Sequence, residues 1–374
     1  MNKLKLMTIV GTRPEIIKMA EIIKKCDEFF DHILVHTGQN YDYQLNDVFF
    51  KDLGLKAPDY YLGVVGENLG QTMGNVISKS YELMSQINPD AVIVLGDTNS
   101  CLSVIPAKRL KIPIFHMEAG NRCKDENLPE EVIRRIVDVT SDINLCYSEH
   151  ARKYILDSGV RPEYTFVVGS PMAEVLGKYE QNINESDILN KLGLKRKGYI
   201  LLSAHREENI DIEKNFFSLM NSINDMAKYF NMPILYSCHP RSEKYISQRK
   251  FIFDKNIIKH KPLGFFDYNQ LQKNAFCVIS DSGTLPEESA YLHFPAVSIR
   301  TSTERPEALD SGVFIIGSIT SESIIQSVIM ATKLQSEGYV PSPVEAYNDR
   351  NVSSKVIRLI QSYTQIVNKM IWRK

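Results

Sequence analysis

Short apolar runs rich in β-branched residues alternate with helical patterns along the whole chain, and this alternation restricts the possible fold more than any other feature. The first series of runs lies at 4–10, 33–36, 91–95, 112–115, 143–147 and 165–168, and the second at 199–203, 234–237, 276–280, 296–299 and 313–316. Strands that alternate with helices are typical of parallel sheets built from βαβ units. The sequence therefore predicts an α/β protein with two such sheets.

The length of the chain also indicates two domains. Its 374 residues exceed one ordinary domain and allow two, each large enough to bury its own core. The segment 169–198 opens with Gly-Ser-Pro and carries a polar stretch at 180–187, which predicts a connection between domains. We expect an N-terminal domain at 1–169 and a C-terminal domain at 170–351, with a final helix at 352–374 that packs back on the first.

Charge and composition exclude several classes of partner. The chain has 44 basic and 45 acidic residues and a net charge of -1, so nothing indicates electrostatic capture of nucleic acid or of an anionic membrane. No apolar run approaches the roughly 18 residues of a membrane span, and the N-terminus lacks the apolar core of a signal peptide. The six cysteines form no CxxC pair and are predicted to be small buried residues in a reducing compartment. We expect a soluble, cytoplasmic protein.

The first predicted strand runs into Gly11-Thr12-Arg13-Pro14-Glu15, at the start of a helical pattern that also contains Lys18. A glycine turn that leads into a helix presents backbone N–H groups, and two cations add to the positive end of the helix dipole. This pattern predicts a small anion site, although an ordinary strand-to-helix turn would look the same. It differs from the GxGxxG fingerprint, which argues against a nicotinamide or flavin cofactor.

Carboxylates follow the next strands of the first half. Asp97 follows the third strand, and the loop His116-Met117-Glu118 to Glu130-Glu131 follows the fourth. Like charges held close together make one of them easier to protonate, which would supply an acid and a base without a metal. No spacing of His or Cys supports a metal site. The alternatives are a helix N-cap for Asp97 and a solvated charged loop for 116–131.

The second half repeats the pattern at two of its strand ends. His205 and Arg206 follow one strand, where a histidine could equally be a helix cap or a core residue, and Asp281 opens a second turn. Small residues at a helix start can hold a phosphate through backbone N–H groups, and a carboxylate one turn later can hold a ribose diol. The residues expected to do so are Ser282, Gly283 and Thr284, followed on the helix by Glu287 and Glu288, with Arg305 able to complete a diphosphate clamp. Together they predict a nucleotide diphosphate bound in a cleft between the domains.

Seven motifs carry a specific resemblance. GTRPE, GDTNS, HMEAGNR, PEE, HREEN, DSG with EE, and TERPEA occur in this order over nearly the whole chain. In these motifs the chain resembles the non-hydrolysing UDP-N-acetylglucosamine 2-epimerases. The resemblance implies two Rossmann-like domains in a GT-B-like arrangement, with the nucleotide-sugar site in the inter-domain cleft and UDP bound mainly by the second domain. It implies neither a metal nor a nicotinamide cofactor.

The resemblance also implies a reaction, in which UDP is eliminated to give a 1,2-glycal and is then added back with the opposite configuration at C2. A proton leaves one face of C2 and arrives on the other, so two separate groups are needed. Carried over motif by motif, the proton-transfer and leaving-group residues are Asp97, Glu118, Glu130 and His205. The implied UDP-binding residues are Arg13, Lys18, Ser282, Gly283, Thr284, Glu288 and Arg305, with Tyr268 placed where an aromatic ring packs on uracil.

Two departures from the family pattern bear on the substrate. Gln39-Asn40-Tyr41-Asp42 replaces the Gln-His pair that holds a second, activating UDP-N-acetylglucosamine, and Leu62-Gly63-Val64-Val65 lacks the arginine that follows it. The loop between Glu118 and the PEE motif is short, and Asn121 replaces an apolar residue. Both changes resemble the branch that makes UDP-N-acetyl-L-fucosamine from its L-talosamine epimer for capsule or O-antigen synthesis.

We therefore expect a bacterial, homodimeric UDP-N-acetyl-hexosamine 2-epimerase, with the L-talosamine to L-fucosamine reaction favoured. The alternative within the family is UDP-N-acetylglucosamine 2-epimerase, which forms UDP-N-acetylmannosamine. A GT-B glycosyltransferase would share the UDP site but would need an acceptor surface, and a binding protein without catalysis would not need Asp97 and Glu118. A nicotinamide-dependent 4-epimerase is disfavoured because the chain has neither GxGxxG nor Tyr-xxx-Lys.

Overall fold

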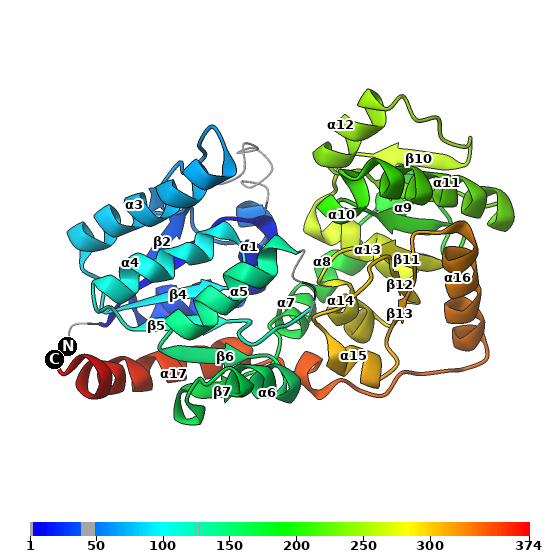
Figure 1. Ribbon diagram of the computed structural model, residues 1–374. Coiled ribbons are helices and arrows are strands. Elements are labelled where there is room, and N and C mark those ends of the chain that lie inside the picture. Colours follow the sequence, from blue (N-terminus) through cyan, green and yellow to red (C-terminus); the bar gives the residue numbers. More distant parts are fainter. Residues whose placement is uncertain (1–2, 39–48, 124, 126–127) are drawn as a thin grey trace. The chain divides into compact units, whose positions relative to one another are not determined.

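The computed structural model describes residues 3–38, 49–123, 125 and 128–374 of the chain. They form two compact α/β units, Met1–Gly177 with Glu345–Lys374, and Lys178–Val344. Each unit contains one parallel sheet with helices packed on its faces (Figure 1).

The first unit contains a seven-stranded sheet in the order β3-β2-β1-β4-β5-β6-β7. All of its strand pairs are parallel. The strands are β1 (Lys5–Val10), β2 (Asp31–His36), β3 (Tyr60–Tyr61), β4 (Ala91–Leu95), β5 (Ile114–Met117), β6 (Ile143–Cys146) and β7 (Thr165–Val167). The chain moves outward in one direction from β1 and in the other from β4, so these two neighbours form a topological switch point. In open α/β sheets, ligands bind at the carboxyl ends of the strands at such a point.

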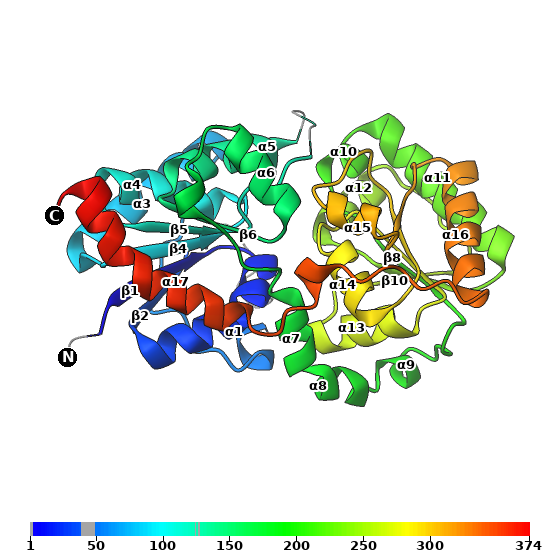
Figure 2. The same cartoon turned by 90° about the horizontal axis from the view of Figure 1, so that it is seen from below.

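The helices of the first unit include one from each end of the chain. Helix α17 packs against α1, as Figure 2 shows, so the last helix completes the unit formed by the first half of the chain. The helices are α1 (Arg13–Phe29), α3 (Leu69–Ile87), α4 (Val104–Arg109), α5 (Pro129–Thr140), α6 (Glu149–Asp157), α7 (Met172–Lys178) and α17 (Val352–Val367). Short turns of 3-10 helix lie at η1 (Asn99–Ser103), η2 (Pro162–Tyr164) and η3 (Glu345–Tyr347), and a π-helical turn, η4 (Asn368–Trp372), ends α17.

The second unit repeats this plan with six parallel strands in the order β10-β9-β8-β11-β12-β13, and its switch point lies between β8 and β11. The strands are β8 (Ile200–Ser203), β9 (Ile234–Ser237), β10 (Ile257–His260), β11 (Cys277–Ser280), β12 (Ala296–Ser298) and β13 (Ile315–Ile316). The helices are α8 (Glu180–Glu185), α9 (Ile188–Lys191), α10 (Glu207–Ile210), α11 (Glu213–Phe230), α12 (Pro240–Gln248), α13 (Phe265–Asn274), α14 (Leu285–Leu292), α15 (Pro306–Asp310) and α16 (Ser321–Ser336).

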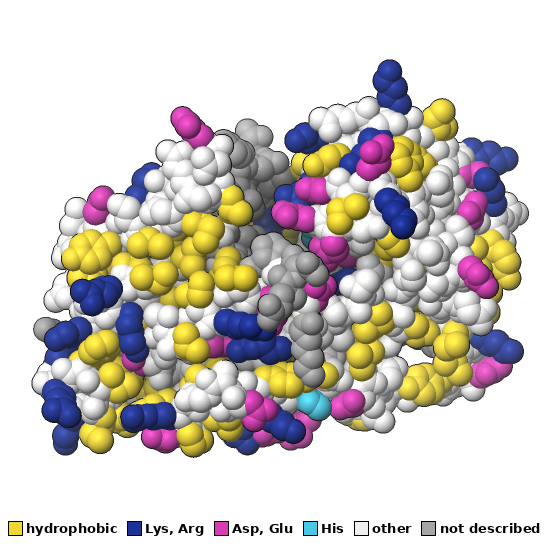
Figure 3. Space-filling view, in the orientation of Figure 1, with side chains coloured by type: hydrophobic (Ala, Val, Ile, Leu, Met, Phe, Trp, Pro, Cys, Tyr) yellow, Lys and Arg dark blue, Asp and Glu magenta, His cyan; other side chains and the backbone are white. Residues whose placement is uncertain are grey.

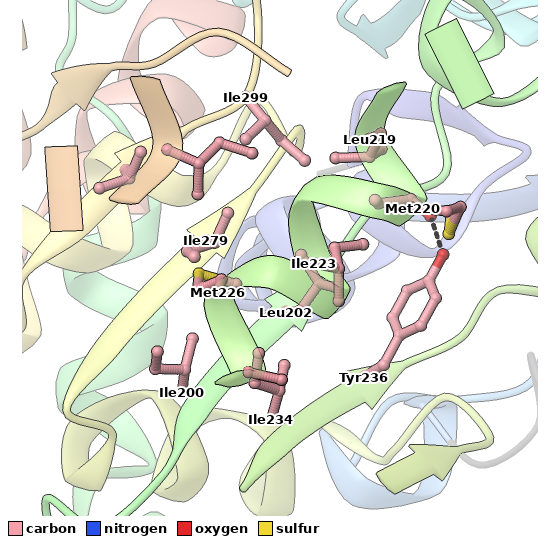
Figure 4. Close-up of a cluster of buried hydrophobic side chains, with 14 of the residues drawn as sticks. Ile200, Leu202, Leu219, Met220, Ile223, Met226, Ile234, Tyr236, Ile279 and Ile299 are labelled. Carbon is pink, nitrogen blue, oxygen red and sulfur yellow. Dashed lines mark hydrogen bonds between the residues drawn. The ribbon is translucent and has the colours of Figure 1, made fainter. Parts of the chain in front are cut away.

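Helix α11 shows how periodicity builds the core of the second unit. Phe216, Leu219, Met220 and Ile223 recur at three- and four-residue steps and are all fully buried. Figure 4 shows Leu219, Met220 and Ile223 among side chains from the strands, where the Tyr236 hydroxyl donates to the Ala204 carbonyl at 3.0 Å. Fully burying a side chain of this size contributes about 1.5–3 kcal/mol, so this single face fixes the helix on the sheet.

The predicted strands are found, most with limits that differ by one or two residues; β2 begins two positions earlier than predicted and β13 two positions later. Strand β5 begins at Ile114, two positions later than predicted, because Pro113 precedes it and only the Pro113 carbonyl pairs, with the Val92 N–H. The edge strands β3 and β10 were not predicted, since β3 has only two residues and β10 lacks a buried face. The segment 169–198 is helical rather than a plain linker. Its helix α7 stays with the first unit, because Glu174 accepts from the Ser353 N–H at 2.8 Å.

An apolar stripe remains on the surface of the first unit. Leu69, Met73, Ile77 and Tyr81 follow each other at four-residue steps on α3, and the Leu69 and Tyr81 side chains are 60% and 48% exposed. Figure 3 shows hydrophobic side chains gathered on the face that carries α3 and α4. The homodimer expected from the sequence stays a prediction.

Among the helices that the structure describes, none is long and apolar enough to cross a membrane.

Candidate active site

A buried carboxylate joins the two loops at the switch point of the first unit. Glu15 is 1% exposed, and its Oε2 accepts from the Gly11 N–H at 3.0 Å and from the Thr12 hydroxyl at 2.7 Å, both in the loop after β1. Its Oε1 accepts from the hydroxyls of Thr98, at 3.2 Å, and of Ser100, both in the loop after β4. Burial raises the pKa of Glu15, and these hydrogen bonds offset part of that rise. The loops that carry Arg13 and Asp97 are therefore tied together.

Glu118 lies at the carboxyl end of β5 with a partner on each oxygen. Lys18 Nζ is 2.7 Å from Oε2, with side chains only 5% and 10% exposed. The Tyr147 hydroxyl donates to the same oxygen at 3.2 Å, and Asn121 Nδ2 donates to Oε1 at 3.1 Å. The φ of Glu118 is 63°, a left-handed conformation that non-glycine residues rarely adopt and that often marks functional positions.

Asp97 and Glu130 lie in the same unit with different surroundings. Asp97 pairs with Arg134, whose Nε is 2.6 Å from Oδ2. Arg134 also contacts Glu131, with Nη1 3.2 Å from Oε2. Glu130 is half-buried in the first turn of α5. The predicted cluster of like charges therefore contains cations, because Lys18 contacts Glu118 and Arg134 contacts Asp97.

Two positions before Glu118 lies His116, which was predicted to follow the strand and which forms a buried pair with Asp138. His116 is 1% exposed within β5, with Nε2 2.9 Å from the Gly96 carbonyl and Nδ1 3.1 Å from Asp138 Oδ1. Asp138 also accepts from the Gly120 N–H at 3.2 Å and pairs with Arg122 at 2.7 Å. Burial alone would raise the pKa of Asp138, but His116 and Arg122 lower it. Asp138 thus fixes the turn that carries Glu118.

In the second unit, Asp281 connects the loops that follow β8 and β11. Its Oδ2 accepts from the N–H groups of His205 and Arg206, each at 2.9 Å, and from Asn209 Nδ2 at 3.2 Å. His205 Nδ1 lies 3.1 Å from Oδ1, and the histidine side chain is 39% exposed. Arg206 Nε donates to the Asp281 carbonyl at 2.9 Å. His205 is therefore held by a fully buried aspartate at the carboxyl edge of the sheet.

The turn after Asp281 links its hydroxyl groups to Glu288. Ser282 Oγ lies 3.0 Å from Thr284 Oγ1, which donates to Glu288 Oε1 at 2.9 Å. A Cβ at Gly283 would lie 2.7 Å from Glu304 Oε1, so a side chain there would require a shift. Burial raises the pKa of Tyr268, and the charge of Glu288 adds to the rise. Of the residues predicted to bind UDP, this turn and Tyr268 are thus brought together around Glu288.

Arg305 and Arg13 have different surroundings. Arg305 is 1% exposed, and its Nε and Nη2 lie 3.0 and 2.9 Å from Glu287 Oε1. Arg13 is half-buried, with its guanidinium 5.9 Å from the centre of the Phe49 ring. The structure shows Arg305 in a buried ion pair with Glu287. A contact between Arg305 and a diphosphate stays a prediction.

Of the two segments that depart from the family pattern, 39–42 and 62–65, the structure describes only the second. The segment 39–42 lies outside the described residues. In the later loop, Val64 is fully buried, and Lys79 Nζ donates to the carbonyls of Leu62 and Gly63 at 3.0 and 2.6 Å. Within the described part of the chain, no group of three or more His, Cys, Asp or Glu side chains could hold a metal ion.

Comparison with known proteins identifies the family. The family model for UDP-N-acetylglucosamine 2-epimerase matches residues 24–361. The chain belongs to the UDP-N-acetylglucosamine 2-epimerase family. It is 33% identical to UDP-N-acetylglucosamine 2-epimerase of Methanocaldococcus jannaschii over 341 residues, which cover 88% of this chain and 93% of that protein. It is 30% identical to UDP-2,3-diacetamido-2,3-dideoxy-D-glucuronate 2-epimerase of Pseudomonas aeruginosa, with 87% and 91% covered.

Solved structures of family members share the fold. The structure of UDP-N-acetylglucosamine 2-epimerase from Rickettsia bellii has a TM-score of 0.93 and 45% identity, with all of both chains covered. The Methanocaldococcus jannaschii enzyme in complex with UDP-N-acetylglucosamine and UDP has a TM-score of 0.89 and 28% identity, with 96% of this chain and 99% of that chain covered. The predicted α/β fold with two Rossmann-like sheets is confirmed, and so is the prediction of an isomerase of the UDP-sugar 2-epimerase type.

Sequence analysis of this family member missed several residues that support the site. Glu15, Tyr147, Asp138, Arg134 and Asp281 were not singled out for a role. Tyr147 and Asp281 come at or just after the ends of predicted strands, which is the signal that could have marked them. Arg134 and Asp138 lie inside α5, where nothing in the periodicity separates a buried charged residue from an exposed one.

Replacing Gly120 by alanine tests how tightly the turn after Glu118 is packed in this epimerase. The φ of Gly120 is 82°, and an added Cβ would lie 2.1 Å from the Ala151 carbonyl oxygen. Gly159 has a φ of 88° but nothing within 4 Å, so Gly159→Ala measures the conformational cost alone, about 1–2 kcal/mol. Gly120→Ala should lower the free energy of unfolding in urea by about 1–3 kcal/mol more than Gly159→Ala does, because the added Cβ overpacks the turn. Equal losses for the two variants would show that the turn can relax.

Replacing Arg305 tests whether this side chain mainly stabilises the fold or mainly binds UDP. Arg305→Met would leave Glu287 buried without its cation and should cost about 3–5 kcal/mol in urea unfolding, and adding Glu287→Leu should recover most of that loss. The control is Arg152→Met, which removes a 2.6 Å pair with Glu149 whose side chains are 39% and 69% exposed and should cost less than about 1 kcal/mol. Unchanged stability of Arg305→Met with weaker UDP binding in calorimetry would instead support the diphosphate clamp.

Proposed function

We propose that this epimerase converts UDP-N-acetylglucosamine to UDP-N-acetylmannosamine by elimination and re-addition of UDP. The observation that carries the proposal is the Glu118 carboxylate, held by Lys18, Tyr147 and Asn121 at the carboxyl edge of a parallel sheet. The named activities of the relatives from Methanocaldococcus jannaschii and Rickettsia bellii support this substrate over the L-talosamine derivative that the sequence favoured.

The reaction inverts C2 through two proton transfers. A base takes the C2 proton, the C–H electrons form a C1–C2 double bond, and the C1–O bond breaks with UDP as the leaving group. UDP then adds back at C1, and an acid delivers a proton to the opposite face of C2. Because the two faces need separate groups, we assign proton transfer and assistance to the leaving group to Asp97, Glu118, Glu130 and His205.

Lys18 connects the diphosphate to this chemistry. Its ammonium group is bound to Glu118, and its side chain is only 5% exposed. An anionic diphosphate near Lys18 would compete with Glu118 for the ammonium group, so arrival of the substrate would weaken the pair and leave the carboxylate more basic. We assign the other contacts to UDP to Arg13, to the turn of Ser282, Gly283 and Thr284 with Glu288, to Tyr268 and to Arg305.

A second substrate is supported by Asn121. Its amide donates to Glu118 Oε1 at 3.1 Å, so the residue that departs from the family pattern contacts a proposed catalytic carboxylate directly. The relative from Pseudomonas aeruginosa has a name with a different sugar, so substrates vary among members that are this similar. UDP-N-acetyl-L-talosamine, converted to the L-fucosamine epimer for capsule or O-antigen synthesis, is therefore the second candidate.

The test of the substrate is proton NMR of the purified protein in deuterated water, with the two UDP-sugars supplied separately. UDP-N-acetylglucosamine should be converted to the mannosamine epimer, with deuterium at C2 and no effect of a chelator or added NAD. Faster conversion of the L-talosamine derivative by at least about tenfold would favour the second candidate, since an unpaired 6-hydroxyl costs about 1–3 kcal/mol. A product that keeps its C2 proton would exclude the elimination route.

Asp97→Asn and Glu118→Gln test the assigned proton-transfer residues. Each removes a carboxylate with little change of shape, so the rate should fall by roughly 100-fold or more while UDP affinity in calorimetry changes little. Glu149→Gln is the matched control, because this carboxylate lies in an exposed pair with Arg152 and should leave the rate unchanged. Turnover near the wild-type rate in either active-site variant would make that residue structural.

A further inference from the structure

We propose that Asp281 is a positioning residue that holds the His205 imidazole with its proton on Nδ1, so that Nε2 is the atom that exchanges a proton during epimerisation. The inference rests on the proposed function for its kinetic consequence, because His205 acts there as a proton-transfer group. Its structural part, the choice of tautomer, stands on the contacts of Asp281 alone.

The two oxygens of Asp281 have separate partners. Oδ2 accepts from the backbone of His205 and Arg206, each at 2.9 Å, and from the Asn209 amide at 3.2 Å, which fixes the course of the chain after β8. Oδ1 faces the ring, with His205 Nδ1 at 3.1 Å. One oxygen therefore holds the main chain and the other orients the side chain. This arrangement is the one by which a buried carboxylate selects an imidazole tautomer.

The charge on Asp281 is maintained although its side chain is fully buried. Burial alone would raise the pKa of Asp281, but the nearby charge and hydrogen bond of His205 and the Arg206 N–H lower it well below its ordinary value. Nδ1 is the ring nitrogen placed 3.1 Å from Oδ1, where it can donate to the carboxylate. The His205 side chain is 39% exposed, and with Nδ1 turned toward a buried group its opposite edge, with Nε2, is the accessible one.

The neighbouring His239 has the opposite arrangement and supplies a comparison within the same loop cluster. The two rings lie 5.4 Å apart at an angle of 33°. His239 Nδ1 accepts from the Arg241 N–H at 3.2 Å, so its neutral ring carries the proton on Nε2. Two histidines side by side thus differ in tautomer because one faces a carboxylate and the other faces a backbone N–H.

Asp281→Asn is the decisive variant because it preserves the anchor and inverts the ring contact. The amide oxygen can still accept from the backbone of residues 205 and 206, while its NH₂ group faces Nδ1 and favours a proton on Nε2 instead. The rate should fall by roughly 100-fold or more, with UDP affinity changed by less than about threefold. Asp225→Asn is the control, since this exposed aspartate of the same unit pairs with Lys228 on the surface and should leave the rate within about threefold of wild type.

A double-mutant cycle separates positioning from general destabilisation. If Asp281 acts through the ring, Asp281→Asn should slow the wild-type protein strongly but slow His205→Ala no further, because the group on which it acts is gone. An equal loss in both backgrounds would overturn the proposal and make Asp281 a structural residue. A His205→Ala variant with the wild-type rate would overturn the kinetic part in the same way.

The tautomer itself is measured by NMR of protein labelled with ¹⁵N in its histidine rings, at a pH where His205 is neutral. We expect a proton on Nδ1 of His205 in the wild type and on Nε2 in Asp281→Asn, with His239 unchanged. An Nε2 proton in the wild type would overturn the inference whatever the enzyme's substrate. Failure of the wild type to epimerise either UDP-sugar would remove the proposed function, while the tautomer measurement would still decide the role of Asp281.

Discussion

One buried carboxylate at each switch point holds together the loops on which the rest of the site depends. In the first unit, Glu15 accepts from the loops that leave β1 and β4, and in the second unit Asp281 accepts from the loop that leaves β8 and lies at the end of β11. Parallel strands end with their backbone groups unpaired at the same edge, so these loops need an internal acceptor. A side chain with two oxygens can join two loops at once.

Ion pairs between cations and carboxylates that are wholly or partly buried hold the charged groups of the site. Lys18 with Glu118 and Arg134 with Asp97 place a positive charge beside two of the proposed catalytic groups, while Arg305 with Glu287 lies deeper. Such pairs gain little net stability after desolvation, yet removing one partner is costly. The pairs therefore keep the charged groups in place, and the diphosphate of a nucleotide sugar is an anion for which the cations can exchange partners.

The fold could be predicted from the sequence because it depends on local patterns. Ala91–Leu95 and Ile234–Ser237 were predicted with their observed limits, since a buried parallel strand is a short apolar run between polar turns. The edge strand Ile257–His260 was missed because its side chains are not buried. The apolar stripe of the last helix predicted that it packs back on the first domain, and the structure shows α1 as its partner. The sequence did not predict how 169–198 is divided between the two units, because a hydrogen bond between Glu174 and Ser353 holds α7 in the first unit.

For the site, the sequence by itself determined which polar and charged residues follow the strand ends and, through seven ordered motifs, the family. It placed Lys18, Glu118 and His205 at the correct edges of their sheets, because parallel strands bring all their carboxyl ends to one side. Only the tertiary structure decided which side chains meet: Lys18 contacts a residue 100 positions away, and His205 one that is 76 positions away. Hydrogen bonds and ion pairs act over a few ångströms in space, so partners so distant in sequence leave no periodic signal in the chain.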